Sequence, residues 1–130
     1  MATFREIAND PVSTVYYDWQ ESGFRCLVLR GPAHVCAYIG VKESHPFYGK
    51  DYSDLNIDCH GGLTFASNGE DDSSWPSGWW WLGWDYGHYN DASLYNIKYE
   101  SLTGIEWTPE MVKREFPEVI AQFILEQEKE

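Results

Sequence analysis

The residues best suited to chemistry in this sequence are Asp85, His88 and Asp91, which are spaced three apart, and the more distant His60. Two carboxylates and two imidazoles could bind a divalent metal, with a bound water as the nucleophile. The same groups could perform general acid–base catalysis without a metal, because histidine titrates near neutral pH. This spacing would place three side chains on one face only in a helix, and the glycines among them disfavour a helix.

Structural roles for the same residues remain open beside these chemical ones. A histidine next to a glycine pair, as His60 is, can satisfy backbone groups, and an aspartate after a strand can cap a turn. Cys59 does not complete a thiolate–imidazole pair with His60, because neighbours on a strand point to opposite faces. The sequence contains no motif of serine hydrolases, nucleotide-binding loops or zinc proteases.

Tryptophans and carboxylates are concentrated in the same part of the chain. Between Lys50 and Lys98 there is no lysine or arginine, whereas this stretch contains eight acidic residues. The tryptophans could fill the core beneath a hydrated acidic rim. Alternatively, rings on the outer face of a strand could anchor a partner or a ligand. The second interpretation predicts a binding surface of Trp75, Trp79, Trp81, Tyr86, Tyr89, Glu70, Asp71 and Asp72.

The elements that would position these residues are a small sheet and one helix. Apolar, β-branched and aromatic runs predict strands at 14–17, 24–30, 34–41, 57–65 and 79–84. The runs at 24–30 and 34–41 are nearly continuous, which is typical of central strands. Thr108 as an N-cap and Pro109 after it predict a helix that Pro117 divides. The expected fold class is α+β, a small, mainly antiparallel sheet with a C-terminal helix packed on one face, in a single domain over residues 1–130.

The composition argues against several classes of partner. The 130 residues include 9 Lys+Arg against 21 Asp+Glu, which gives a formal net charge of −12. Such a chain repels polyanions, so direct binding of nucleic acid or of an anionic membrane is disfavoured. Neither a membrane-spanning run nor a signal peptide is recognisable, which favours a cytoplasmic location. The three cysteines show neither a disulfide framework nor zinc-site spacing, and we expect Cys26 and Cys36 to be buried.

Two strings of residues carry a resemblance to a known family. His60–Phe65 reads HGGLTF and Trp81–Asp91 reads WLGWDYGHYND, and CAYIG at 36–40 and His45-Pro46 fit the same pattern. Over roughly residues 15 to 125 the chain resembles a family of small, uncharacterised proteins of bacteriophages and bacterial genomes. The resemblance implies an accessory protein of a phage or prophage that acts in the bacterial cytoplasm, and it implies no particular activity.

Two functions from different classes are therefore expected. The first is a non-catalytic acidic inhibitor that takes part in phage counter-defence. It would block a basic host protein that handles nucleic acid, or sequester a small ligand, and would need no cofactor. The alternative is a small metal-dependent or acid–base hydrolase that uses His60, Asp85, His88 and Asp91. Only this alternative would require a divalent metal.

Overall fold

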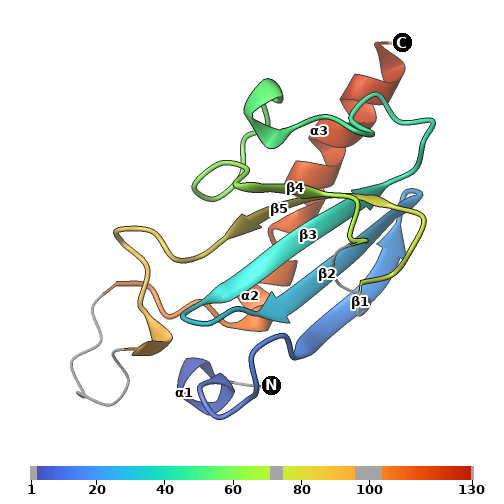
Figure 1. The fold of residues 1–130 in the computed structure, drawn as a ribbon. Coiled ribbons are helices and arrows are strands. Elements are labelled where there is room, and N and C mark those ends of the chain that lie inside the picture. The colour runs from blue at the N-terminus through green and yellow to red at the C-terminus, as the bar shows by residue number, and fades with distance from the viewer. Residues whose placement is uncertain (1–2, 71–74, 96–103, 130) are drawn as a thin grey trace.

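The fold is a five-stranded sheet with helices on one face. The structure is a computed structural model that describes residues 3–70, 75–95 and 104–129. The strands are antiparallel throughout and follow the order β1-β2-β3-β5-β4. Figure 1 shows helix α3 crossing behind the sheet. The predicted α+β class is confirmed. The strands are β1 (Val15–Glu21), β2 (Phe24–Arg30), β3 (Val35–Val41), β4 (Phe65–Ser67) and β5 (Trp80–Asp85).

The C-terminal helical region begins and divides where the sequence predicts. The Thr108 hydroxyl accepts a hydrogen bond from the backbone N–H of Met111, which caps α2 (Pro109–Lys113). Helix α3 (Phe116–Glu128) has Pro117 in its first turn, where a missing N–H costs no helical hydrogen bond. A short helix α1 (Phe4–Ile7) and the 3₁₀ turn η1 (Tyr52–Asp54) were not predicted. Within the described ranges, no helix is long and apolar enough to cross a membrane.

The main core lies between the sheet and the C-terminal helices. Cys26 on β2 and Ile39 on β3 face this core and are fully buried, as the near-continuous apolar pattern of the two central strands predicts. The Phe116 ring of α3 packs against Trp19 and Trp84, with ring centroids 4.8 and 5.0 Å apart respectively. These aromatic contacts fix α3 on one face of the sheet. The C-terminal helices do not cover the opposite face (Figure 1).

The prediction that Trp79 and Trp81 are exposed is wrong. Trp81 is 0% and Trp79 is 6% exposed, because both belong to a second, smaller core on the face without helices. Trp75 covers Trp81, with ring centroids 5.3 Å apart, and the Lys42 ammonium lies 4.0 Å above the Trp79 ring. Gly40, opposite Trp81 in the β3–β5 register, leaves room for the indole to lie against the sheet. Tertiary contacts thus cover a strand face that a single-layer sheet would expose.

The region 57–65 differs most from its predicted strand. Only its last residue joins β4, because Gly61 and Gly62 have φ values of 71° and 79°, which extended strands do not adopt. The chain there forms a turn that carries His60 past the end of β5. Strand β1 also differs from its prediction, since it extends to Glu21 instead of ending at residue 17. A tight turn at Ser22-Gly23, with both residues at positive φ, joins it to β2.

Candidate functional site

The two aspartates and two histidines singled out in the sequence converge without a helix. Asp85 is the last residue of β5, and the turn that follows brings His88 and Asp91 back toward the strand end. The loop that precedes β4 supplies His60. Its Nε2 lies 2.7 Å from Asp91 Oδ2, and its ring centroid lies 5.6 Å from that of His88. These four residues, which we call the His–Asp cluster, therefore form two pairs, His60 with Asp91 and His88 with Asp85.

Asp91 is a buried carboxylate that three donors hold in place. Its side chain is 1% exposed. It accepts hydrogen bonds from the His60 imidazole, the Trp107 indole at 2.9 Å and the backbone N–H of His88 at 2.9 Å. Burial by itself opposes ionisation, but these hydrogen bonds outweigh it, so the pKa of Asp91 lies below its ordinary value. Asp91 is thus an anion near neutral pH, and His60 Nε2 must carry the proton of their shared bond.

Aromatic rings fix the orientation of the His60 imidazole. The Tyr86 ring stacks on it at 4.4 Å with an interplanar angle of 14°, and Trp107 contacts it edge-on at 5.0 Å. The Tyr86 hydroxyl is held in turn, since it accepts from Trp84 Nε1 and donates to Glu115 Oε1. The imidazole consequently has one position and one tautomer, in which Nδ1 is the basic nitrogen. Within the described residues, Nδ1 has no hydrogen-bond partner.

His60 lies beside a cavity of about 250 Å³ on the helix side of the sheet. Asp58, Glu115 and Glu118 contribute carboxylates to its wall, and Cys59 also lines it. Burial raises the pKa of the Cys59 thiol to about 12, so it remains protonated near neutral pH and is a poor nucleophile. The cavity wall therefore contains an imidazole and carboxylates but no thiolate nucleophile.

The second pair, His88 and Asp85, lies at the end of β5. His88 Nε2 is 3.2 Å from Asp85 Oδ1, but the two groups are not aligned for a hydrogen bond, so this buried nitrogen is unpaired within the described chain. Asp85 is itself held by Thr64 Oγ1 and by the backbone N–H of Gly87. A Cβ on Gly61 would overlap the His88 ring at Nε2. The glycine therefore permits the close approach of the His88 ring.

The cluster does not suit a metal ion. Across residues 3–70, 75–95 and 104–129, no three His, Cys, Asp or Glu side chains converge on a point where they could bind one. The reason is that the Nε2 atom of each imidazole faces a different carboxylate, so the four groups form pairs instead of a shared ligand set. The metal site expected as an alternative for His60, Asp85, His88 and Asp91 is therefore not formed by the described residues. The four side chains are arranged as two histidine–aspartate pairs instead.

The residues of the expected aromatic binding surface fall into separate groups. Trp79, Trp81 and Tyr86 are buried and cannot contact a partner directly. Trp75 is half-buried, whereas Tyr89 is 99% exposed and Glu70 is exposed. Asp71 and Asp72 lie outside the described residues. No continuous aromatic surface is formed by the described part of the set, because the tryptophans pack on one another and on the sheet.

Three further residues belong to the site and were missed in the sequence. Trp107 directly precedes the predicted N-cap of α2 and bonds Asp91. Glu115 lies between α2 and α3 and accepts from Tyr86. His34, before β3, has its Nε2 3.9 Å from Asp85 Oδ1 and packs against Gly87. The Gly31-Pro32 turn indicates that a strand starts near His34. It does not indicate the contact of His34 with Asp85, because that contact depends on the β3–β5 register.

No family model, curated protein or solved structure matches the chain.

Proposed function

We propose that this protein is an acid–base hydrolase whose proton acceptor is His60, oriented by the buried carboxylate of Asp91. One observation carries the proposal. The imidazole donates from Nε2 to an ionised carboxylate that is 1% exposed, so that Nδ1, which has no partner among the described residues, is the basic nitrogen beside a cavity. A histidine held by a buried aspartate is the arrangement that hydrolases use to fix an imidazole tautomer and to stabilise the imidazolium ion.

The proposed step is attack of water on an acyl or phosphoryl centre. His60 Nδ1 takes one proton as the water oxygen bonds to that centre. The leaving group departs with the bonding electron pair and receives a proton from the protonated His88. In this proposal a substrate in the cavity contacts His60 directly and His88 through one water molecule, since only His60 lines the cavity and the two ring centroids are 5.6 Å apart.

Hydrolysis of chromogenic substrates tests this function. The panel is p-nitrophenyl acetate, bis(p-nitrophenyl) phosphate and an acetyl p-nitroanilide. We expect turnover of at least one, lowered about 100-fold or more in His60→Gln, since general acid–base catalysis contributes about 10²–10⁴-fold. His60→Ala should recover part of its rate when imidazole is added, which loss of a structural residue would not explain. Asp54→Asn is the control, because Asp54 is an exposed carboxylate in η1.

The proposal is rejected if no panel member is hydrolysed faster by the wild-type chain than by His60→Gln. Addition of EDTA should leave the rate unchanged, since the described His, Cys, Asp and Glu side chains form no metal-binding group. A rate that EDTA abolishes would contradict the acid–base mechanism specifically.

A second candidate is the non-catalytic acidic inhibitor of a basic host protein, acting in the bacterial cytoplasm during phage counter-defence. Exposed tyrosines in the stretch without lysine or arginine favour it. Tyr52 lies beside the exposed Asp51 and is 39% exposed, and Tyr89 is 99% exposed. Tyrosine is a frequent interface anchor, and surrounding carboxylates would steer a basic partner. In this form of the proposal, tyrosines replace the buried Trp79 and Trp81 as anchors.

Partner capture at two salt concentrations tests the inhibitor. A partner retained from bacterial lysate at about 50 mM salt should be largely lost at about 500 mM, because salt screens exposed charges. Tyr89→Ala should release the partner, whereas Leu125→Ala should retain it, since Leu125 is exposed on α3 outside the acidic stretch. Retention by Tyr89→Ala at high salt would exclude this mode of binding.

A further inference from the structure

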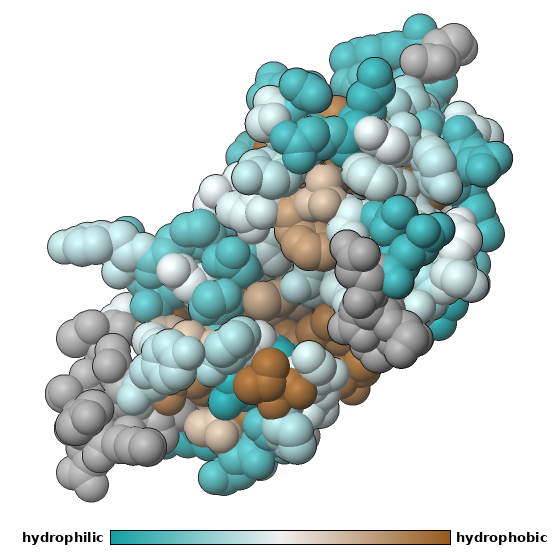
Figure 2. All heavy atoms as spheres, in the orientation of Figure 1, coloured by the Kyte–Doolittle hydropathy of each residue, from teal (hydrophilic) through white to brown (hydrophobic). Residues whose placement is uncertain are grey.

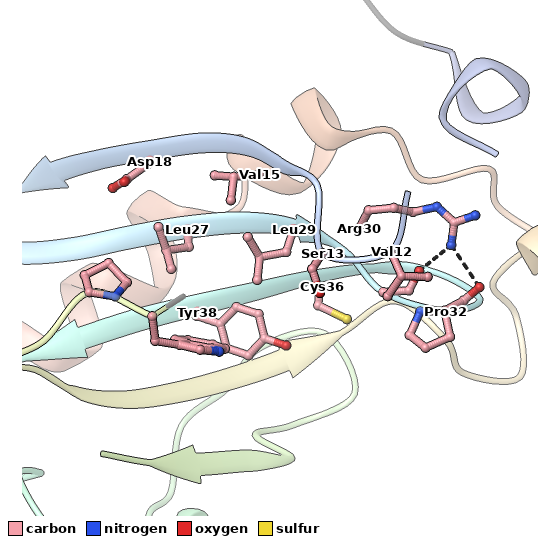
Figure 3. Close-up of a pocket in the computed structure, with 13 residues that line it drawn as sticks. Val12, Ser13, Val15, Asp18, Leu27, Leu29, Arg30, Pro32, Cys36 and Tyr38 are labelled. Atoms are coloured by element: carbon pink, nitrogen blue, oxygen red, sulfur yellow. Dashed lines mark hydrogen bonds between the residues drawn. The ribbon is translucent and has the colours of Figure 1, made fainter. Parts of the chain in front are cut away.

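A second cavity lies on the sheet face that the helices leave uncovered. Its volume is about 300 Å³, and strands β1, β2 and β3 form its floor. Val15, Leu27, Leu29 and Tyr38 point into it from these strands, as Figure 3 shows for the labelled side chains. Figure 2 shows hydrophobic residues gathered in a hollow on the face turned to the viewer. We call this cavity the sheet-face trough.

The trough is apolar where a solvated sheet face would be polar. In the row that runs across the strands, Leu27 pairs with Asp18 on one side and with Tyr38 on the other. Antiparallel sheets covered on one side commonly expose polar residues on the other side. Here Val15 remains 54% exposed at the rim, although Trp75 and its neighbours cover the adjoining part of the face.

Neither of the two charged residues that line the trough directs a free charge into it. Asp18 forms two hydrogen bonds with the Arg25 guanidinium, at 2.8 and 3.0 Å. The Arg30 guanidinium turns away and donates to the backbone carbonyls of Gly31 and Pro32. The Asp18 charge is therefore paired with Arg25, and the Arg30 guanidinium, although no ion pair within the described residues balances its charge, has its donors occupied by backbone carbonyls. The net charge of −12 further disfavours an anion.

Aromatic rings form one wall of the trough. Tyr38 and Trp75 meet edge-to-face at 4.8 Å, and Phe65 stacks behind Trp75 at 5.6 Å. Such an array offers ring faces and edges to a further aromatic ring. An apolar cavity of about 150 Å³ accommodates benzene, so the larger trough suits two fused rings. A second copy of the chain fits less well, because two hollows facing each other across a two-fold axis would leave a void.

We propose that the sheet-face trough binds an uncharged molecule with two fused aromatic rings. The volume sets the size of the ligand, and the aromatic wall sets its flat shape. An uncharged ligand is favoured because Asp18 is already paired with Arg25 and the Arg30 guanidinium is turned away toward backbone carbonyls. This site is separate from the His–Asp cluster, whose cavity lies on the helix side of the sheet. The inference therefore does not depend on the proposed hydrolase activity.

Methyl NMR with indole as the probe tests the proposal. Titration should shift the methyl signals of Leu27, Leu29 and Val15 with saturation and a Kd below about 1 mM, which is within the range for a ligand of this size. Val119, on the helix side, should not shift. Leu29→Gln should weaken binding at least about tenfold, because it places an amide in the apolar floor.

Matched variants and probes complete the test. Val15→Gln changes an exposed rim position, so the fold should persist, and binding should weaken at least about threefold. Leu125→Gln on α3 should leave the Kd unchanged. Indole-3-acetate and tryptamine, the anionic and cationic counterparts, should bind at least about tenfold more weakly than indole, because a desolvated charge would find no partner.

Three results of the titrations would overturn the proposal, and a dilution experiment gives a fourth. They are an indole Kd unchanged by Val15→Gln, equal binding of the charged probes, and methyl shifts outside the trough only. Trough methyl signals that move on dilution without indole would also overturn it, because a second copy of the chain would then be the occupant.

Discussion

Replacement of Asp91 by asparagine is the perturbation with the clearest structural consequence. The substitution keeps the shape of the side chain but removes its charge. Three hydrogen bonds, from His60, Trp107 and the His88 backbone, lose their ionic acceptor. A hydrogen bond to a charged group contributes about 1.5–3 kcal/mol, against about 0.5–1.5 kcal/mol for a neutral one. The three bonds together therefore lose about 3 kcal/mol.

Two further contributions partly cancel. The amide nitrogen that Asp91→Asn introduces would face either the His60 Nε2 proton or the His88 N–H and leave a donor unpaired, at a cost of about 1–3 kcal/mol. The mutant no longer buries a charge, and this relief offsets a similar amount, since the side chain is 1% exposed. We expect the free energy of unfolding to fall by about 3 kcal/mol at pH 7, from the loss of the charge-assisted bonds.

The pH dependence separates the effect of the Asp91 charge from that of the introduced amide. The folded-state pKa of Asp91 is lowered, so its stabilisation is complete above the unfolded-state pKa of about 3.9 and is lost as pH falls through the folded-state value. The difference between the wild type and Asp91→Asn should therefore shrink below about pH 4. Urea unfolding followed by tryptophan fluorescence at pH 7 and at pH 3 measures both differences.

Asp54→Asn provides the control for this experiment. Its carboxylate is exposed, so the substitution should change stability by less than about 0.5 kcal/mol at either pH. A loss below about 1 kcal/mol for Asp91→Asn at pH 7 would refute the argument that the three bonds depend on the charge. A loss that stays the same at pH 3 would show that the unpaired donor of the introduced amide, rather than the ionisation of Asp91, causes it.

Three other changes test the packing of the site. Gly61→Ala should destabilise the protein by several kcal/mol in thermal unfolding, because its Cβ would overlap the His88 ring, whereas Gly49→Ala, at a similar positive φ with open space, should lose only about 1–2 kcal/mol; equal losses would contradict the close contact. Trp81→Ala should cost about 3–5 kcal/mol in urea unfolding, as expected for a buried tryptophan, and a loss near zero would mean that the ring is exposed after all. Cys59, whose pKa burial raises to about 12, should react with iodoacetamide at pH 8 far more slowly than free cysteine, as mass spectrometry can follow, and equal rates would show a thiolate.

Local sequence patterns were sufficient where an element depends on its own residues. The apolar runs at 24–30 and 34–41 correctly identify the two strands β2 and β3 in the interior of the sheet. Thr108 and Pro109 likewise locate the start of α2. Alternation also separates Trp80 from Trp81 onto opposite faces. It could not show that both faces are covered, because the cover on the second face comes from Trp75, Phe65 and Tyr38 through tertiary packing.

The candidate site shows the same division more sharply. Amino-acid types alone determined the acidity of the chain, the absence of lysine and arginine around the tryptophans, and the identity of the side chains able to exchange protons. Only the tertiary structure decided that His60 meets Asp91 and that His88 meets Asp85. The physical reason is that the left-handed glycines before β4 bring His60 to Asp91 from 31 residues away, while an irregular turn after β5, rather than a helix, returns His88 to Asp85.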